Sequence, residues 1–336
     1  MTETRFSLAL DQDLLSLPEG DVAVLNAAGD MDLSFASADQ LHLNQSFYPD
    51  HKALASRGFN VTVNAPASVA ASLVMCHRSK PATFDLLARA VEQTTVGGIV
   101  AVEGAKTDGV ESVLKAVRAR FDGVEVYSKA HGKLFWFARP DALPDLSDWK
   151  AKPILLEGGF TTYPGVFSSD GVDKGSAMLA QHLPEFKGPV ADLGAGWGYL
   201  ARKILTSDGV KSLDLIEADY HALEAAKLNI TDPRAAFHWG DVTYHVGSNY
   251  AVVVSNPPFH LGRKPTPELG QMFIRRAADM LMPKGQFWMV ANRNLPYEQT
   301  LNERFGQVDT IAQTAGFKVI CARRPLSVSQ SARARR

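Results

Sequence analysis

A stiff polar corner follows an apolar segment near residue 255, and its residue types could position an amino group. Residues 251–255 (AVVVS) read as a buried strand and lead directly into Asn256, Pro257, Pro258 and Phe259. Proline fixes φ and removes a backbone donor, so the corner is rigid and its carbonyl groups stay available. The Asn256 side-chain oxygen and the Pro257 carbonyl could accept the two N–H bonds of an exocyclic amine, while Phe259 offers a face for stacking a base. A stiff turn without chemistry is the alternative when the motif is taken alone.

A glycine-rich loop that begins 62 residues before Asn256 could hold a reaction partner for such an amine. A short apolar strand at 189–193 leads into Gly194, Gly196 and Gly198 and then into a helical pattern. Glycines let a backbone turn tightly and approach a ligand closely, and the following helix start offers free N–H groups. A carboxylate, Glu217, ends the next strand 21 residues after Gly196, where it can accept hydrogen bonds from a ribose diol. The alternative is a plain tight turn.

The spacing of the glycines distinguishes between two cofactor classes. The dinucleotide fingerprint G-x-G-x-x-G requires a third glycine at position 199, which is Tyr199. The pattern D-x-G-x-G-x-G at 192–198 instead resembles the class I S-adenosylmethionine-dependent methyltransferases. That resemblance implies that the loop, including Ala195, approaches the methionine part of the cofactor and that Glu217 holds its ribose. It also implies that Asp241 contacts the adenine amine, the alternative being an exposed loop aspartate.

These features together predict methyl transfer to an exocyclic amine. The amine of a base is conjugated and poorly nucleophilic, so two acceptors that favour a pyramidal nitrogen would direct its lone pair at the sulfonium methyl. Catalysis would then consist mostly of positioning and electrostatic support. Ligands of open α/β sheets bind at the carboxyl ends of the strands, which is where Asn256 is expected.

Two halves of the chain share one order of elements. The first half shows a strand at 71–76, a helix at 83–95, a strand at 99–104, a helix at 109–121 and a closing hairpin at 124–140. The second shows a strand at 251–255, a helix at 269–282, a strand at 286–292 and a closing segment at 307–325. Breaks at Gly97-Gly98 and at 283–285 separate helix from strand in the two halves. The pattern predicts an α/β protein with two tandem Rossmann-like domains that arose by duplication.

The expected domains are a degenerate methyltransferase-like domain at 1–140, a linker at 141–153, a catalytic domain at 154–326 and a basic flexible tail at 327–336. The net charge of −1 excludes a uniformly basic surface for nucleic acid. The sequence contains no run of about 18 apolar residues, so we expect no membrane span. The two cysteines fit neither a metal site nor a disulfide framework, so we expect no metal and a cytoplasmic protein.

Four stretches are similar to the ribosomal RNA small subunit methyltransferase C family, and the likeness covers nearly all of 155–325. They are PGVFSSDGVDKGSAMLAQHL (164–183), SNPPFH (255–260), VANRNLPY (290–297) and IAQTAGFKV (311–319). The resemblance implies that S-adenosylmethionine is the methyl donor and that the substrate is the N2 of a guanine in small-subunit (16S) ribosomal RNA, free or in an assembling subunit. It also implies that the first half is a methyltransferase domain that has lost its own activity.

The resemblance assigns site residues by their place in the matching motifs. The catalytic motif would be Asn256, Pro257, Pro258 and Phe259. The residues that contact the cofactor would be Asp192, Gly194, Ala195, Gly196, Gly198, Glu217 and Asp241, with Gly175 and Ser176 closing over the methionine end. The chain departs from the family at Ala195-Gly196-Trp197, where Cys-Gly and a smaller residue are expected. Trp197 either packs the helix start on the sheet, which we favour, or shields the cofactor.

The first half lacks both motifs, and basic residues near the second suggest contacts with RNA. Residues 24–34 contain only one glycine, Gly29, and residues 74–81 contain no Asn-Pro-Pro, so we expect no cofactor there. Arg263 and Lys264 follow the catalytic motif and could bind phosphate, and Lys318 is among the basic residues near the chain end. Other targets remain open: a large-subunit guanine, an adenine N6 or a protein glutamine. A non-catalytic RNA-binding assembly factor is the remaining alternative.

Overall fold

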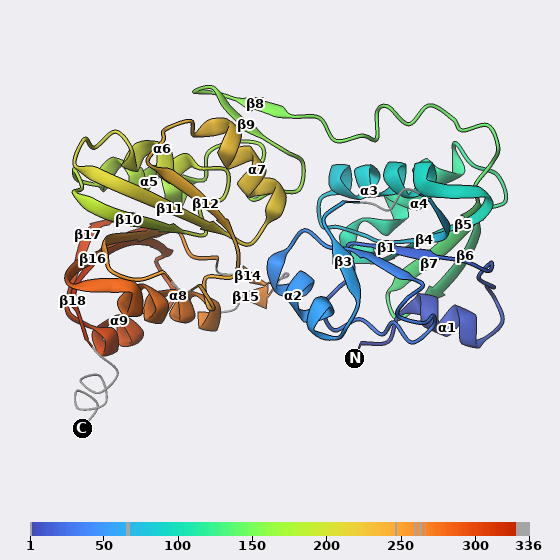
Figure 1. Cartoon of the computed structure of the whole chain (residues 1–336), viewed down its shortest axis with the longest axis horizontal. Coiled ribbons are helices and arrows are strands. Elements are labelled where there is room, and N and C mark those ends of the chain that lie inside the picture. The colour runs from blue at the N-terminus through green and yellow to red at the C-terminus, as the bar shows by residue number, and fades with distance from the viewer. Residues whose placement is uncertain are drawn as a thin grey trace. The chain divides into compact units, whose positions relative to one another are not determined.

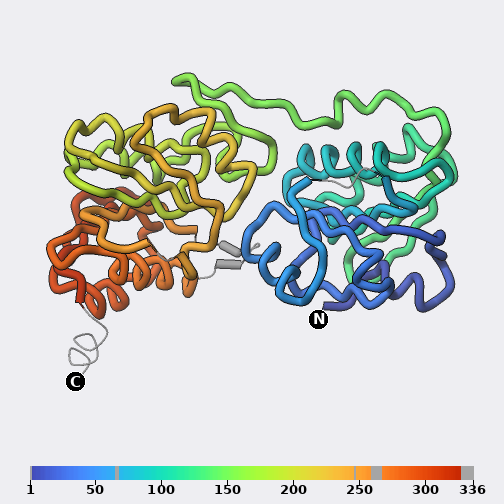
Figure 2. Tube along the Cα trace, viewed as in Figure 1, coloured from blue at the N-terminus to red at the C-terminus, as the bar shows by residue number. Residues whose placement is uncertain are grey.

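The computed structural model describes residues 2–64, 68–245, 247–258, 260–261, 264–265 and 267–326, without the side chains of 260, 261, 264 and 265. The chain divides into two compact units. Unit 1 comprises Met1–Pro153 and Tyr163–Gly165, and unit 2 comprises Ile154–Thr162 and Val166–Arg336. The colour ramp in Figure 2 follows the chain from one unit to the other. The tandem α/β fold expected from the sequence is confirmed (Figure 1).

Unit 1 is built on a seven-stranded sheet in the order β3-β2-β1-β4-β5-β7-β6. Its strands are β1 (Val22–Leu25), β2 (Leu41–Asn44), β3 (Asn60–Thr62), β4 (Val69–Met75), β5 (Thr94–Ala105), β6 (Glu125–Lys129) and β7 (Gly132–Ala138). Its helices are α1 (Arg5–Asp11), α2 (Tyr48–Ser56), α3 (Lys80–Gln93), η1 (Lys106–Asp108) and α4 (Val110–Arg118). Strands β1 to β5 pair in parallel, and β7 pairs antiparallel to both β5 and β6.

Unit 2 repeats this topology in a sheet ordered β12-β11-β10-β13-β16-β18-β17. Its sheet strands are β10 (Gly188–Leu193), β11 (Val210–Glu217), β12 (Ala235–Trp239), β13 (Tyr250–Ser255), β16 (Leu281–Asn292), β17 (Phe305–Gln313) and β18 (Phe317–Pro325). Its helices are α5 (Lys174–His182), α6 (Tyr199–Ile204), α7 (Tyr220–Asn229), α8 (Pro267–Met280) and α9 (Glu298–Arg304). Two small hairpins join β8 (Ile154–Leu156) to β9 (Phe160–Thr162) and β14 (His260–Leu261) to β15 (Lys264–Pro265).

The predicted breaks between helix and strand lie inside strands, which corrects the expected element boundaries. Strand β5 already begins at Thr94 and β16 at Leu281, so Gly97-Gly98 and Pro283 belong to strands. A shift of register makes this possible in unit 2. Tyr250 of β13 pairs with Leu281, but Val252 pairs with Gln286, so the residues between them have no ladder partner in β13. A proline without an N–H therefore fits there.

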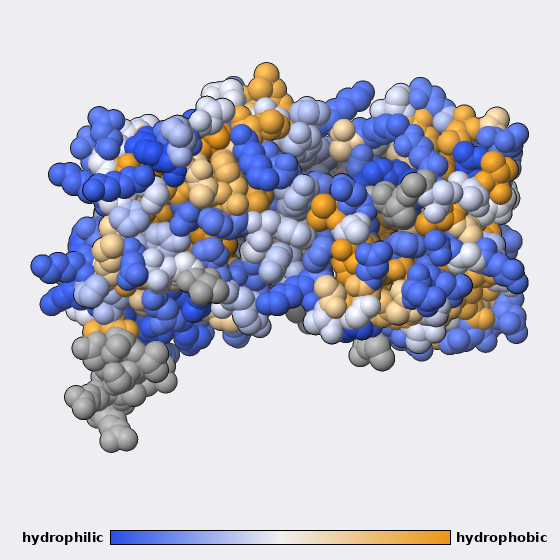
Figure 3. Space-filling view, viewed as in Figure 1, coloured by the Kyte–Doolittle hydropathy of each residue, from blue (hydrophilic) through white to orange (hydrophobic). Residues whose placement is uncertain are grey.

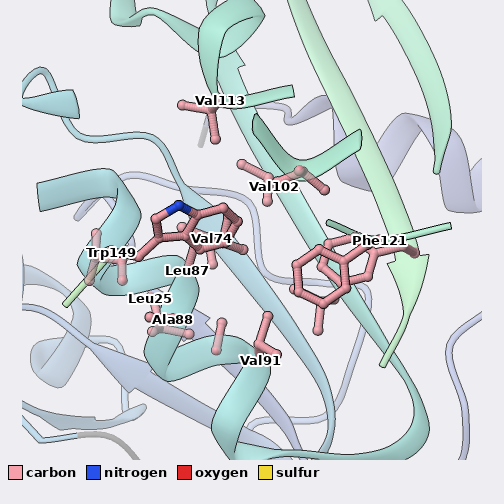
Figure 4. Packing of buried hydrophobic residues seen from close by; sticks show 14 of the residues in the cluster. Leu25, Val74, Leu87, Ala88, Val91, Val102, Val113, Phe121 and Trp149 are labelled. Atoms are coloured by element: carbon pink, nitrogen blue, oxygen red, sulfur yellow. The ribbon is translucent and has the colours of Figure 1, made fainter. Parts of the chain in front are cut away.

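Residues 141–153, expected as a linker, pack against the core of unit 1. Leu146 and Trp149 are only 5% and 4% exposed. The Trp149 ring stacks on Phe84 at 5.1 Å between centroids, and the Arg120 guanidinium lies 4.5 Å from its centroid. Figure 4 shows Trp149 and Phe121 among the aliphatic side chains of this core. The segment forms no helix or strand, so its buried side chains do not recur at a helical or strand spacing in the sequence.

The apolar side chains of each unit gather on the two faces of its sheet, under the helices. Unit 2 has one core cluster that includes Leu200, Leu215 and Val254 and a second that includes Val253 and Phe287. Consecutive residues Val253 and Val254 thus serve opposite faces, as expected for a strand buried on both sides. On the face shown in Figure 3, hydrophobic residues form scattered patches among hydrophilic ones. No helix in the described part of the chain is long and apolar enough to span a membrane.

Candidate active site

The glycine loop connects the end of β10 to the start of α6. Gly194, Gly196 and Gly198 have φ angles of 71°, 54° and 90°, a left-handed region that favours glycine. The Gly194 N–H donates to the Ile216 carbonyl at 2.9 Å, which fixes the loop beside the end of β11. A Cβ on Gly198 would lie 3.1 Å from the Ile230 side chain, whereas a Cβ on Gly196 would meet no described atom within 4 Å. Gly198 therefore allows the loop to pack closely against Ile230, whereas Gly196 borders open space.

Glu217 stands at the end of β11 and is held by two backbone groups. Its Oε2 accepts from the Gly196 N–H at 2.7 Å and its Oε1 accepts from the Asp219 N–H at 2.8 Å. Burial is the largest cause that raises the pKa of Glu217 to about 7, despite these hydrogen bonds. Each carboxylate oxygen can accept a second hydrogen bond, so the group retains capacity for two hydroxyl donors such as those of a ribose.

Asp192, in β10, is a fully buried acid without a hydrogen-bond partner on either oxygen among the described residues. Burial, with a smaller contribution from Glu217, raises the pKa of Asp192 from 3.8 to about 8. The protonated form therefore stabilises the fold at low pH, and this contribution is lost as the pH rises toward 8. A buried acid without partners is an unsatisfied group that a cationic or hydrogen-bonding ligand would stabilise.

Asn256 follows β13 and has a fixed amide orientation. Its Nδ2 donates to Asp173 Oδ2 and to Ser176 Oγ, each at 2.9 Å. A carboxylate only accepts hydrogen bonds, so the atom that faces Asp173 must be the nitrogen. The amide nitrogen is thereby occupied, and no hydrogen bond to the Oδ1 of Asn256 occurs among the residues that the structure describes.

Asp173 and Ser176 belong to the start of helix α5. Asp173 is the N-cap, and its Oδ2 accepts from the Ser176 N–H at 2.8 Å as well as from Asn256. The carboxylate thus links the first turn of α5 to the end of β13, 83 residues away in the sequence. The sequence analysis missed Asp173. The available signal was the acid directly before the Lys-Gly-Ser stretch, because aspartate is favoured at the N-cap of a helix.

A buried serine ties the catalytic corner to the glycine loop. Ser255, which is fully buried, donates from Oγ to the Leu193 carbonyl at 2.7 Å, and the two residues are also neighbours in the β10–β13 ladder. Asn256 and Gly194 directly follow this pair. The two motifs, found separately in the sequence, therefore meet at one edge of the sheet.

A small cavity lies where these elements meet. Its volume is about 50 Å³. The lining residues are Phe167, Ser168, Asp173, Ser176, Gly194, Ala195, Gly196, Trp197, Tyr199, Leu200 and Asn256. A pocket for a whole small-molecule ligand typically has at least about 300 Å³. A nucleoside cofactor must therefore extend beyond this cavity, and the cavity itself suits only a small part of it beside Asn256.

Three further residues from the sequence analysis have mainly structural contacts. Trp197 is 4% exposed, packs edge-on against Phe160 and donates from Nε1 to the Phe167 carbonyl at 3.1 Å. Asp241 accepts at Oδ1 from the Thr243 N–H and hydroxyl at 2.8 and 2.7 Å. It does not line the cavity. A Cβ on Gly175 would lie 3.2 Å from the Phe317 ring, so Gly175 allows α5 to pack closely.

Other predicted residues lie outside the description or outside the site. Phe259 and Arg263 lie outside the described residues, as does the Lys264 side chain. Pro257 is buried and Pro258 is exposed, directly after Asn256. Within the described residues, no group of three or more His, Cys, Asp or Glu side chains could hold a metal ion.

The corresponding place in unit 1 carries different side chains. In the strand ladders Leu25 pairs with Asn44 and Val74, just as Leu193 pairs with Ile216 and Ser255. By this register the equivalent pairs are Asn26 and Gly194, Gln45 and Glu217, and Met75 and Asn256. Asn26 has a left-handed φ of 62°, close to the 71° of Gly194. The backbone conformation at this position is therefore similar in the two units, but unit 1 has neither the acid nor the amide of unit 2.

Two side chains at this place in unit 1, Gln45 and Asn26, are hydrogen-bonded within the unit. Gln45, 2% exposed, donates from Nε2 to the Ala27 carbonyl at 2.7 Å and accepts at Oε1 from the Phe47 N–H at 2.8 Å. Asn26 donates from Nδ2 to the Met75 carbonyl at 3.1 Å. Gln45 and Asn26, which stand at the positions of Glu217 and Gly194, are therefore both hydrogen-bonded to the backbone of unit 1.

Known proteins resemble the chain over most of its length. Residues 157–321 match the family model for the methyltransferase small domain. Ribosomal RNA small subunit methyltransferase C of Shewanella sp. (strain MR-4) is 31% identical over 256 residues, which cover 74% of this chain and 75% of that protein. The protein of the same name in Shewanella loihica is 29% identical with the same coverage of both chains.

A solved structure shares the whole two-unit fold. The T. thermophilus 16S rRNA N2 G1207 methyltransferase (RsmC), in complex with AdoMet and guanosine, aligns with a TM-score of 0.78. The alignment covers 93% of this chain and 90% of that chain at 23% sequence identity. At this identity the likeness establishes the common fold.

Proposed function

The chain belongs to the ribosomal RNA small subunit methyltransferase C family, and from this we propose its reaction. It transfers a methyl group from S-adenosylmethionine to the exocyclic N2 of a guanine in small-subunit ribosomal RNA. Its partner is this RNA, free or in the assembling subunit, and its compartment is the cytoplasm. The observation that carries the proposal is the orientation of Asn256. Two hydrogen bonds of 2.9 Å occupy its nitrogen, and its oxygen, which has no partner among the described residues, can accept from an amine beside the glycine loop.

The residues of the glycine loop fit the proposed cofactor. S-adenosylmethionine supplies a methyl group on a positively charged sulfur. Glu217 would accept from the ribose hydroxyls, the open side of Gly196 would leave room for the bound molecule, and the buried Asp192 would add negative charge behind the loop. Asp241 retains a second carboxylate oxygen for the adenine amine.

Catalysis by this site consists of orientation. The Asn256 oxygen accepts one amine proton, and the Pro257 carbonyl, held by the rigid prolines, accepts the other. The target nitrogen then presents its lone pair to the methyl group. Preorganised acceptors also stabilise the positive charge that develops on the nitrogen, because they need not reorganise during the reaction. The methylated nitrogen loses its extra proton readily, so a dedicated base is not required.

A direct test compares small-subunit RNA from three strains by nucleoside mass spectrometry. The strains are the wild type, a deletion of the gene, and the deletion complemented with an Asn256→Ala variant. We expect one N2-methylguanosine to disappear in the deletion and in the variant, and to return with the wild-type gene. Loss of a methyl group from large-subunit RNA, from an adenine or from a protein glutamine instead would refute the assigned target. Unchanged modification in all three strains would refute the activity.

Cofactor binding should release protons near neutral pH. The pKa of Asp192 near 8 means that much of this group is protonated at pH 7 before binding. A bound sulfonium cation favours the charged form of a nearby acid and so lowers its pKa. Calorimetry at pH 7 in phosphate and in Tris should therefore give different apparent heats, from which proton release can be calculated. An Asp192→Asn variant should release fewer protons, and equal heats in both buffers for the wild type would contradict the expectation.

The intact protein should bind one S-adenosylmethionine per chain, because unit 1 has Gln45 and Met75 where unit 2 has the Glu217 carboxylate and the Asn256 amide. The stoichiometry follows from titration calorimetry of the full chain. A Glu217→Gln substitution should weaken this binding and reveal no residual second site. A stoichiometry of two would show that unit 1 still holds a cofactor.

A further inference from the structure

Unit 1 contains a second cavity, far in sequence from the methylation motifs, whose lining is basic. It lies at the turn between β6 and β7, beside η1 and the first turn of α4, and has a volume of about 310 Å³. Its lining includes three lysines, Lys106, Lys129 and Lys133, together with His131 and a single acid, Glu111. None of the lining residues is Phe, Tyr or Trp, so the cavity offers no ring of that kind for a base to stack on.

Two of the three lysines are uncommitted. Lys133 lies 3.5 Å from Glu111 and donates to the Ser128 hydroxyl at 3.2 Å. Lys106 and Lys129 are exposed and make no ion pair with any residue that the structure describes. The Glu111 carboxylate therefore offsets the charge of Lys133, and the ammonium groups of Lys106 and Lys129 remain available to bind an anion.

The turn that carries Lys129 and His131 is strained. Ala130 and His131, at its centre, have φ angles of 47° and 54°. Two-residue hairpins with both central residues in this region strongly prefer Asn-Gly, because residues with a side chain are disfavoured there. Strained turns persist only where surrounding contacts hold them, and they are frequent at ligand sites.

Arg5 holds this turn in place. Its guanidinium donates to the carbonyls of Lys129 and Ala130 at 2.7 and 2.9 Å, and it pairs with the buried Glu103 at 3.1 Å. A Cβ on Gly132 would lie 2.2 Å from the Arg5 guanidinium carbon, so a side chain there would displace Arg5 from these contacts. The contacts of Arg5 thus hold the basic turn in one conformation.

Several basic residues of unit 2 are committed to the fold, in contrast to this cavity. Lys318 is 4% exposed and forms an ion pair with Glu298. Arg323 pairs with Asp309 at 2.7 Å. Arg276 donates to backbone carbonyls, including that of Val242 at 3.5 Å. Lys318, one of the basic residues near the chain end, is therefore occupied by contacts within unit 2.

We propose that the basic cavity of unit 1 binds the phosphodiester backbone of the substrate RNA. This inference rests on the proposed function, because it is the RNA substrate that identifies the anion as a phosphodiester. The chain as a whole carries a net charge of −1 and does not attract RNA by its total charge, so local basic sites must provide the contacts. Lysine ammonium groups bind phosphate as point charges, and the absence of Phe, Tyr and Trp from the lining fits a backbone contact without base recognition.

The test is the salt dependence of RNA binding by the full-length Lys106→Gln/Lys129→Gln variant. Each lysine–phosphate contact contributes roughly 0.7–0.9 to the slope of log K against log salt concentration. The variant should therefore bind a small-subunit RNA fragment with a slope shallower by roughly 1.4–1.8. The KM for RNA should rise, while kcat and the affinity for S-adenosylmethionine should stay at wild-type values.

A matched control removes two other exposed lysines of unit 1, Lys115 and Lys152, which lie outside the cavity. The Lys115→Gln/Lys152→Gln variant changes the net charge equally and should keep the wild-type slope, and Lys106→Arg/Lys129→Arg should retain binding. A wild-type slope in the cavity variant, or an equal reduction in the control, would overturn the proposal. An equal loss of affinity for polyglutamate would also overturn it, in favour of an acidic protein partner. The salt slopes are obtained from RNA binding alone. They therefore test the cavity independently of the methylation assay, which tests the proposed function.

Discussion

An Asn256→Ala variant should methylate small-subunit RNA roughly 10²–10³ times more slowly than the wild type, as when one preorganised hydrogen-bonding group is removed from an active site. The Asn256 amide nitrogen is held by Asp173 and Ser176, so the wild-type oxygen is presented to the substrate in one orientation. Alanine removes this acceptor but leaves the glycine loop intact. The rate of a single turnover should fall, whereas the affinity for S-adenosylmethionine should barely change.

The matched control is Asn294→Ala, which removes an exposed asparagine of the same unit outside the cavity. It should methylate at the wild-type rate. If Asn256→Ala keeps a single-turnover rate close to that of the control, the amine is oriented by other groups and our assignment of Asn256 is wrong. If cofactor affinity falls together with the rate, Asn256 supports the cofactor site instead.

A Gly196→Val variant should bind S-adenosylmethionine roughly 100-fold more weakly, a loss of about 2.7 kcal/mol. Gly196 has a φ of 54°, its N–H donates to the Glu217 carboxylate, and a Cβ on it would meet no described atom within 4 Å. A valine there would occupy the volume expected for the cofactor. The left-handed φ adds a fold-stability cost of about 1–2 kcal/mol, measurable by denaturant unfolding.

Gly159→Val separates these two effects. Gly159 also has a left-handed φ, 71°, and open space at its Cβ position, but it lies in the turn between β8 and β9 and does not line the cavity. It should lose a similar amount of stability and bind the cofactor normally in calorimetry. Unchanged affinity in Gly196→Val would mean that the loop is only a turn.

Local patterns explain why much of the architecture could be predicted from the sequence. The valines of 252–254 and the glycines of 194–198 have strong conformational preferences of their own, and the position of Asn256 follows from the strand before it. The partners of Asn256 could not be predicted in the same way. Asp173 lies 83 residues away and is ordinary as a helix cap, so only the packing of α5 beside β13 reveals its second contact.

Segments without regular secondary structure are harder still to predict from the sequence. Residues 141–153 contain prolines and charges typical of a linker, yet Leu146 and Trp149 are buried in unit 1. Likewise Lys318 is a residue type that usually lies on the surface, but here it is buried, pairs with the Glu298 carboxylate and donates to the Leu295 carbonyl. In both cases long-range contacts outweigh the average behaviour of the residue type, and a single sequence carries no record of such contacts.

The hydrogen bonds of Gln45 and Asn26 also limit which single substitutions toward the residues of unit 2 the fold of unit 1 can tolerate. A Gln45→Glu change alone would replace the donor to the Ala27 carbonyl with a buried carboxylate oxygen, and Asn26→Gly alone would leave the Met75 carbonyl without its partner. Each substitution would thus destabilise unit 1 before any cofactor could bind and compensate. A cofactor site could therefore be built in unit 1 only by changing several residues together.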